Sequence, residues 1–277
     1  MRPARISRMN ILGGWTTGLP LILILGVIGT SGLKGADHLR SEPGFRSLFN
    51  GNDLSGWHKN PVKIVHGTGG HWIVEDGAIT GEQDPPGSGN GGILLSDETF
   101  GDSEVAFDTK PDWGIDSGFF LRSNEKGECY QIMIDYYDGG NVGEIYREGL
   151  DGWSNQTLQI FGVFQDQEKK ILSGTRAQQA KKDEYGAGGK ARIALANWSK
   201  VWKVNDWNTI RARVEGEPPT ITTYVNNRLI SRFVSDKSFE ALGSKGRLGL
   251  QVHGGKTWPK GAKVRFRNIQ VKQLSRP

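Results

Sequence analysis

The stretch TIRARVE at residues 209–215 alternates strictly between apolar and polar side chains. Ile210, Ala212 and Val214 share one face, and charged side chains occupy the other. Such alternation over a short run indicates a strand of an antiparallel sheet, with one face in the core and one in water. The pattern recurs in EVAFDTK (104–110), SGFFLRS (117–123), TITTYVN (220–226) and RLGLQVH (247–253). These runs predict an all-β fold, a jelly-roll β-sandwich of two antiparallel sheets.

Turn signals and one phase shift add detail to this prediction. Asp76-Gly77 and Asn226-Asn227 each separate two apolar runs, so each predicts a tight hairpin. Near the C-terminus the apolar phase shifts by one residue, which predicts a β-bulge around Asn268.

The N-terminal residues 1–36 have the pattern of a secretory leader. They begin with a basic, acid-free stretch, continue through the apolar run LPLILILGVI (19–28) and end on small residues. We therefore expect residues 1–36 to be a signal peptide and the protein to be secreted or periplasmic. The alternative is an uncleaved anchor through residues 11–33, which are long enough to span a bilayer with tilt. A membrane is a partner only if this segment is retained.

The remaining residues 37–277 are enough for one large β domain. Residues 165–192 are charged and lack strand alternation, so we expect a long excursion rather than a second domain. The one cysteine, Cys129, allows no internal disulfide, and its expected place is inside a strand. No His–Cys spacing indicates zinc, so neither a metal nor a cofactor is predicted.

The net charge of the chain is +5 at pH 7. Residues 1–36 carry four positive charges and no negative ones, which leaves +1 for the rest. A phosphate-backbone partner needs a concentrated basic stripe, and a nearly neutral body lacks one. Nucleic-acid binding is therefore excluded as a function class.

Several polar residues stand on the strands that the alternation predicts. Gln131 and Asp135 share a face of the run YQIMIDYYD (130–138), and Gln251 and His253 share the polar face of 247–253. If one sheet carries both faces, these side chains converge with Arg122 from 117–123. The alternative is that they are ordinary solvent-facing residues of a half-exposed sheet.

Several blocks of the sequence together resemble the 3-keto-disaccharide hydrolase domain family. They run in the family's order from about residue 47 to 273, nearly the whole of the predicted domain. The blocks are SLFNGNDLSGW (47–57), WIVEDGAITGE (72–82), SGFFLR (117–122), EIY (144–146), DWN (206–208), LQVHG (250–254) and VRFRNIQ (264–270).

The resemblance implies a concanavalin-like jelly roll that acts on sugars oxidised at C3. A ketone at C3 acidifies the hydrogen at C2, so a base can remove it and the glycosidic oxygen leaves C1 by elimination. Water then adds. This route needs one general base, an enolate stabiliser and an acid for the leaving group. It does not need the spaced carboxylate pair of an ordinary glycoside hydrolase.

The resemblance also implies roles for individual residues. Arg122 and His253 are expected to contact the ketone or oxyanion. Asp135 or His253 is expected to act as the base, and Tyr146 is expected to be the acid that protonates the leaving oxygen. Four further residues are expected to bind the sugar, which is an oligosaccharide or a 3-keto-glycoside: Gln131, Gln251, Trp153 and Asp116.

One departure from the family pattern bears on activity. Many members have Glu and then Gln on the strand after SG-x-F-x-R, where this chain has Gln131 and Met133. The loss of that carboxylate leaves two readings open. Either another carboxylate takes its place in an exported enzyme, or the protein is a non-catalytic, lectin-like carbohydrate-binding module. A third reading is an envelope-associated structural protein held by residues 11–33.

Overall fold

The computed structural model describes residues 42–63, 66–136, 140–153 and 198–275. The expected excursion at 165–192 and the expected leader at 1–36 lie outside these ranges. Among the described residues, no helix is long and apolar enough to cross a membrane.

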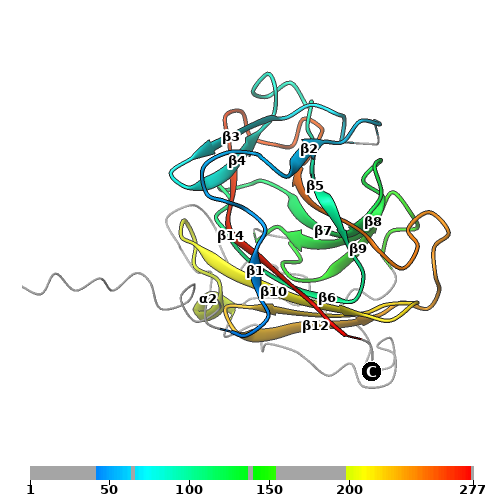
Figure 1. Ribbon diagram of the computed structural model, residues 1–277. Coiled ribbons are helices and arrows are strands. Elements are labelled where there is room, and N and C mark those ends of the chain that lie inside the picture. The colour runs from blue at the N-terminus through cyan, green and yellow to red at the C-terminus, as the bar shows by residue number, and fades with distance from the viewer. Residues whose placement is uncertain (1–41, 64–65, 137–139, 154–197, 276–277) are drawn as a thin grey trace, which may run out of the picture. The chain divides into compact units, whose positions relative to one another are not determined.

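Fourteen strands and one short helix make up the described part of the domain (Figure 1). They are β1 (Arg46–Ser47), β2 (Trp57–Lys59), β3 (His71–Glu75), β4 (Ala78–Glu82), β5 (Gly92–Phe100), β6 (Ser103–Thr109), β7 (Ser117–Ser123), β8 (Cys129–Ile134), β9 (Ile145–Glu148), α2 (Trp198–Val201), β10 (Asn208–Glu215), β11 (Thr220–Val225), β12 (Arg228–Val234), β13 (Gly246–Val252) and β14 (Val264–Gln273).

The strands form two antiparallel sheets. The larger sheet has eight strands in the order β12-β11-β10-β6-β14-β4-β3, and β1 pairs with β14. The smaller sheet has six strands in the order β2-β5-β13-β7-β8-β9. Figure 1 shows the green strands β7, β8 and β9 in one layer and the yellow β10 with β12 in the other. This is a concanavalin-like jelly-roll sandwich, so the predicted fold class is confirmed.

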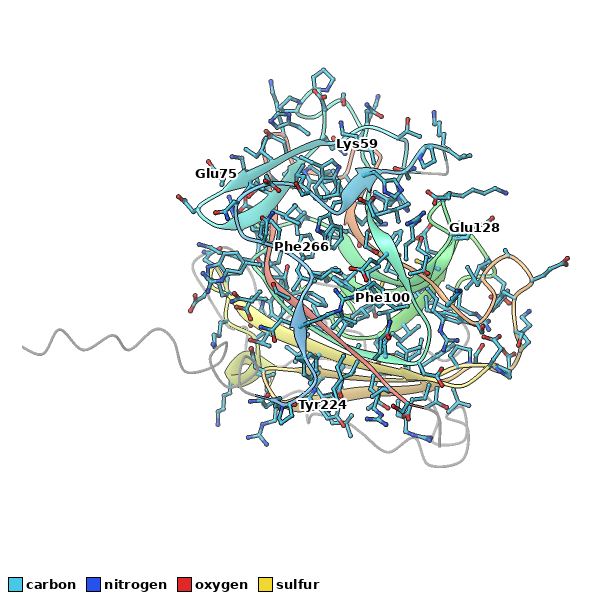
Figure 2. All side chains as sticks on the ribbon, viewed as in Figure 1. Lys59, Glu75, Phe100, Glu128, Tyr224 and Phe266 are labelled. Carbon is cyan, nitrogen blue, oxygen red and sulfur yellow. The ribbon has the colours of Figure 1, made fainter. Side chains whose placement is uncertain are left out.

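The core lies between the sheets, and on β10 it follows the predicted alternation. On β6 and β7 every residue is buried, so the expected water-facing side of these two strands is wrong. On β10, Ile210, Ala212 and Val214 are buried, and the residues between them are only partly buried. Phe107 of the larger sheet stacks on Phe119 of the smaller sheet, with 4.0 Å between ring centroids. Figure 2 shows how densely side chains fill the space between the layers. Burial of these apolar faces is the main force that holds the sheets together.

The predicted turns and bulge are confirmed by the backbone. Asp76 and Gly77 have φ of 51° and 71°, and Asn226 and Asn227 have φ of 47° and 64°. Two successive positive φ values match the twist of the flanking strands, and Asn, Asp and Gly reach them at least cost. Asn268 has φ of 52° where the register between β14 and β6 shifts, as the phase change predicted.

The smaller sheet also buries side chains on its outer face, the face turned away from the larger sheet. A second apolar cluster there consists of Ile93, Leu95, Phe120 and Cys129, each with no exposed surface. Burial raises the pKa of the Cys129 thiol well above its ordinary value, so the thiol is an inert packing group as expected. This outer face carries the candidate site.

Candidate functional site

A pair of amides crosses the outer face of the smaller sheet. Gln131 on β8 donates through Nε2 to Oε1 of Gln251 on β13, over 3.0 Å. Strand β7 runs between them, and a Cβ at Gly118 would come within 2.2 Å of the Gln131 amide nitrogen. Only glycine at 118 leaves room for this contact. Gln131 Oε1 and Gln251 Nε2 are buried and have no hydrogen-bond partner among the described residues.

Two histidines lie edge to face beside this pair, with 4.3 Å between ring centroids. His253 Nδ1 contacts the carbonyl of Gly254, so this nitrogen must carry the proton. Its Nε2 is then an unprotonated acceptor. Burial lowers the pKa of His253 below 6.5, and the neighbouring His66 lowers it further. His253 is therefore neutral at pH 7, with a lone pair on Nε2.

His66 comes from the loop between β2 and β3 and is 3% exposed. Its Nδ1 accepts the backbone N–H of Gly254 over 3.4 Å, which leaves the proton on Nε2. That nitrogen lies 3.1 Å from Oε1 of Glu148 on β9. The two histidines are thus held in opposite tautomers by the same residue, Gly254.

Asp116 provides a second carboxylate. Its Oδ2 lies 3.9 Å from His253 Nε2, and its Oδ1 is buried with no hydrogen-bond partner among the described residues. Burial raises the pKa of Asp116, against the opposing effect of His253 and His66, and the charge of Glu148 raises it too. A carboxylate at this distance stabilises the imidazolium that forms when His253 takes a proton.

Tyr146 lies on β9 two residues before Glu148, so both side chains share the outer face. The ring of Trp153 meets Tyr146 edge to face, with 5.1 Å between centroids, and is 37% exposed. Burial and the charges of Glu148 and Asp116 raise the pKa of the Tyr146 phenol. The phenol therefore keeps its proton and can donate it.

We call these residues the His66 cluster: His66, Asp116, Gln131, Tyr146, Glu148, Gln251 and His253. The structure thus brings together five of the eight residues expected from the sequence, and Trp153 contacts one of them. Gln131 and Gln251 are joined by a hydrogen bond, and an Asp116 oxygen lies 3.9 Å from His253 Nε2.

Asp135 follows directly after strand β8. It is 5% exposed, and its Oδ1 accepts the backbone N–H of Asn141 over 2.7 Å. Burial raises its pKa well above the ordinary value, and the charge of Asp116 adds to this effect. The His253 side chain is 29% exposed whereas Asp135 is buried and already accepts the Asn141 N–H, so the geometry favours His253 over Asp135 as the base.

Arg122 does not join the cluster, contrary to the expected role at the ketone. Its guanidinium is buried and pairs with Asp102 at 2.9 Å and Glu217 at 3.0 Å, and it donates to the carbonyl of Gly216. Asp102 lies in the turn that joins β5 of the smaller sheet to β6 of the larger sheet, and Gly216 and Glu217 lie in the turn between β10 and β11. Arg122 has φ of 52°, and the neighbouring strand β13 has a register shift after Arg247. This irregularity turns the side chain out of the alternation that would have placed it on the outer face.

The sequence prediction missed His66 and Glu148. Glu148 could have been found, because it follows Tyr146 by two residues on one strand and so shares its face. His66 has no such signal, since it reaches the sheet from a loop without periodicity.

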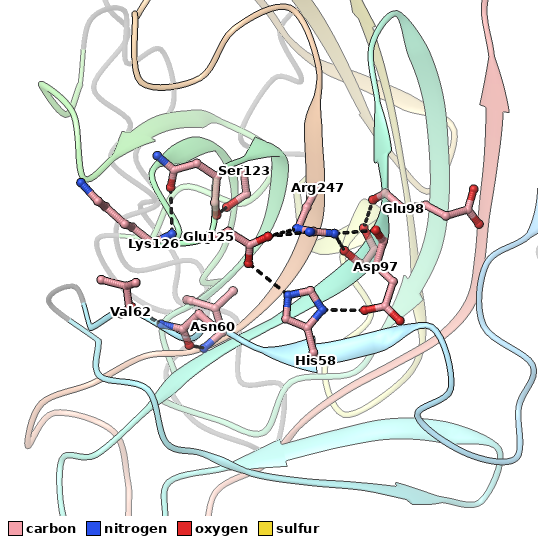
Figure 3. A network of polar contacts seen from close by, with 12 residues as sticks. His58, Asn60, Val62, Asp97, Glu98, Ser123, Glu125, Lys126 and Arg247 are labelled. Carbon is pink, nitrogen blue, oxygen red and sulfur yellow. Dashed lines mark hydrogen bonds and ion pairs between the residues drawn. The ribbon is translucent and has the colours of Figure 1, made fainter.

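A second polar network lies near one edge of the same sheet (Figure 3). His58 lies between two carboxylates, with Nδ1 2.6 Å from Asp97 and Nε2 3.1 Å from Glu125. Arg247 also donates to Glu125, over 2.6 Å. Because its members pair with one another and their side chains are partly exposed, this network needs no ligand.

The His66 cluster suits a ligand that carries hydroxyl groups. Its partnerless atoms include acceptors on Gln131 and Asp116 and a donor on Gln251. A hydroxyl both donates and accepts, so a polyol can satisfy such a mixture. Within the described ranges, no group of three or more His, Cys, Asp or Glu residues has the geometry to hold a metal ion.

Comparisons with solved structures give jelly-roll proteins of low identity. A native glycosidic hydrolase is 12% identical, with 84% of this chain and 96% of that chain covered and a TM-score of 0.46. The carbohydrate-binding module CBM66 from Bacillus subtilis is 15% identical (79% and 96% covered, TM-score 0.43). A β-1,3-1,4-glucanase from a mouse hindgut metagenome is 13% identical (83% and 97% covered, TM-score 0.44).

A search of curated proteins found no match to this sequence. A family model does match: the 3-keto-alpha-glucoside-1,2-lyase-like domain, over residues 44–272. This range includes every residue of the His66 cluster and most of the chain. The chain therefore belongs to the family of 3-keto-α-glucoside-1,2-lyase-like domains, a carbohydrate-active, glycosyl hydrolase-like family.

Proposed function

We propose that the protein cleaves 3-keto-glycosides, such as 3-keto-disaccharides, by elimination followed by hydration. The observation that carries the proposal is the environment of His253. Its Nδ1–H is held by the Gly254 carbonyl, and its lowered pKa keeps Nε2 free to accept a proton next to Asp116. A neutral imidazole of fixed tautomer is a competent general base at neutral pH.

In the proposed first step His253 Nε2 takes the proton from C2 of the sugar. The electron pair of the C2–H bond moves into the C2–C3 bond, and the C3 ketone becomes an enolate. The amide N–H of Gln251 that lacks a partner is a suitable donor to this oxygen. Asp116 stabilises the imidazolium that results.

In the second step the enolate collapses and expels the oxygen at C1. Tyr146 supplies the proton to this leaving oxygen, since its raised pKa keeps the phenol protonated. The product is a 2-hydroxy-3-keto-glycal. Water adds its oxygen at C1 and a proton returns to C2, which completes the cleavage.

The alternative function is sugar binding without chemistry, which Gln131 in place of a family Glu would favour. Asp116 and Glu148 argue against it, because they supply carboxylates on the same face of the sheet. The exposed ring of Trp153 beside Tyr146 suits either function, since sugars pack their C–H faces on aromatic rings.

The test is incubation of the purified protein with a 3-keto-disaccharide, with and without a chelator, followed by detection of the released sugars. We expect turnover in both conditions, and loss of about 100-fold or more in kcat for His253→Ala. His71→Ala is the matched control, because His71 is exposed at the start of β3. Binding of the sugar with no turnover by the wild-type protein would instead establish the lectin-like alternative.

We also propose that the protein is exported, with residues 1–36 acting as a signal peptide. The support is the basic start and apolar run of that segment. N-terminal sequencing of the protein from the culture medium or periplasm tests this. An intact N-terminus in the membrane fraction would indicate an anchor through residues 11–33.

A further inference from the structure

A cavity lies on the larger sheet, among residues that take no part in the His66 cluster. Its volume is about 450 Å³, within the range of small-molecule sites. It is formed where the chain after β1, the β3–β4 turn and the bulge of β14 meet. Its lining consists of Ser47, Phe49, Asn50, Gly51, Gly77, Asn268 and Gln270.

The shape of this cavity depends on backbone that only a few residue types adopt. Gly51 and Gly77 have φ of 84° and 71°. A Cβ at Gly51 would have no atom within 4 Å, and a Cβ at Gly77 would lie 4.0 Å from the Gly51 carbonyl oxygen. Both glycines thus adopt φ values that residues with a side chain rarely reach. Asn268 reaches its own positive φ at the bulge, and its Nδ2 donates to Asp108 over 2.7 Å, which fixes the side chain.

The chemistry of the lining indicates the class of ligand. Gln270 is 8% exposed, and its Oε1 is buried with no hydrogen-bond partner among the described residues. Ser47 donates its hydroxyl proton to the Phe49 carbonyl, so its oxygen can still accept. None of the seven lining residues carries a charge. A buried acceptor without a donor is unfavourable, so this site favours an occupant that supplies a hydroxyl or an amide proton.

We propose that this cavity is a second carbohydrate site, which binds one neutral sugar unit through Gln270 Oε1 and Ser47 Oγ. A sugar presents hydroxyls that both donate and accept, and its C–H groups suit the glycine backbone. An anionic sugar finds no positive charge in the lining. The site is separate from the proposed reaction, because the two sets of residues share no member.

The probe is methyl α-D-glucopyranoside, titrated into ¹⁵N-labelled protein at millimolar concentrations. We expect saturable shifts of the backbone amides of Gly51, Gly77 and Gln270. Gln270→Leu should weaken this binding about tenfold, because it removes the acceptor and keeps the size of the side chain. Gln273→Leu is the matched control, since Gln273 is exposed further along β14.

Two further variants, Ser47→Ala in the cavity and His253→Ala in the His66 cluster, distinguish sugar binding at the cavity from binding at the cluster. Ser47→Ala should also weaken binding, and it decides the matter if Gln270→Leu does not fold. His253→Ala should leave the shifts at Gly51 and Gly77 unchanged, whatever it does to turnover. The proposal is overturned if these amides do not move, or if the folded Gln270 and Ser47 variants bind the sugar as the wild-type protein does.

Discussion

The polar groups at the two ends of strand β7 differ in whether the protein itself completes their hydrogen bonds. At its C-terminal end the Arg122 guanidinium is buried, and it pairs with Asp102, Glu217 and the carbonyl of Gly216. The His66 cluster, which extends past the N-terminal end of β7, is partly buried, and atoms of Gln131, Asp116 and Gln251 there are buried with no hydrogen-bond partner among the described residues.

Arg122 with its partners and the His66 cluster are both groups of polar side chains in a domain that is held together mainly by apolar burial. What separates them is whether the protein itself completes the hydrogen bonds. A buried charge with its own partners needs nothing further, whereas a buried polar group without a partner is a place where a ligand or a water can complete the hydrogen bond. By this criterion Arg122 has a structural role, and the His66 cluster is the place where we propose that the sugar binds.

The largest effect expected from this comparison is on stability. Arg122→Met leaves the carboxylates of Asp102 and Glu217 without their buried partner, so the free energy of unfolding should fall by about 3 kcal/mol or more. Arg213→Met is the control, because its pair with Glu215 is exposed and contributes less than about 1 kcal/mol. Chemical denaturation measures both.

Activity of the folded Arg122 variant completes this test. We expect its kcat on a 3-keto-glycoside to stay near the wild-type value. A stable Arg122→Met protein that has lost turnover would return Arg122 to the site.

The next effect is on the leaving-group step. Tyr146→Phe removes the proton donor and keeps the ring against Trp153, so kcat should fall about 100-fold with little change in KM. Tyr224→Phe on β11 of the larger sheet is the control and should be neutral. A rise in KM with unchanged kcat would make Tyr146 a binding residue only.

The pH dependence of turnover tests the assignment of His253 as the base. The base is active when neutral, and burial lowers the pKa of His253 below 6.5. Turnover should therefore hold through pH 6.5 and then fall, by about tenfold per pH unit below the His253 pKa. The Tyr146 pKa is raised above 10, so no alkaline loss is expected before that pH. An acidic limb centred above pH 6.5 would contradict this assignment.

The smallest effect is expected in the exposed network of Figure 3. Burial alone would raise the pKa of Glu125, but hydrogen bonds from His58 and Arg247 outweigh it and hold the pKa below 4.5. The stabilisation is therefore present above pH 4.5 and is lost as pH falls through the lowered pKa. Glu125→Gln should cost less than about 1 kcal/mol at neutral pH, because solvent screens the pair.

Thermal unfolding of the wild-type and Glu125→Gln proteins between pH 3 and 7 measures this difference. The two curves should approach each other at the acidic end. A constant gap across the range would show that the loss comes from packing and not from charge.

The sequence predicted the sheets because strands are local. Alternation predicted the strands, and turn residues such as Asn226 and Asn227 predicted the hairpins. The phase shift predicted the bulge at Asn268. Each of these features depends on a few adjacent residues, so one sequence is enough to find it.

The site was predicted less well, because it depends on contacts across strands. Arg122 has the right spacing for the outer face, but a local irregularity turns it inward, and nothing in its neighbours signals that. His66 crosses from a loop to Gly254 and Glu148, a contact that no periodicity encodes. Glu148 was within reach of the pattern, since it alternates with Tyr146.

The most direct test of the central claim is to run the cleavage of a 3-keto-disaccharide in D₂O and measure deuterium at C2 of the released 3-keto-sugar by mass spectrometry and NMR. Samples without enzyme and with His253→Ala, incubated for the same time, correct for spontaneous exchange. If His253 removes the C2 proton before the C1 oxygen leaves, the product formed by the wild-type protein carries deuterium at C2. Rapid cleavage with the original hydrogen retained at C2 would contradict the account and would indicate direct displacement assisted by Asp116 and Glu148.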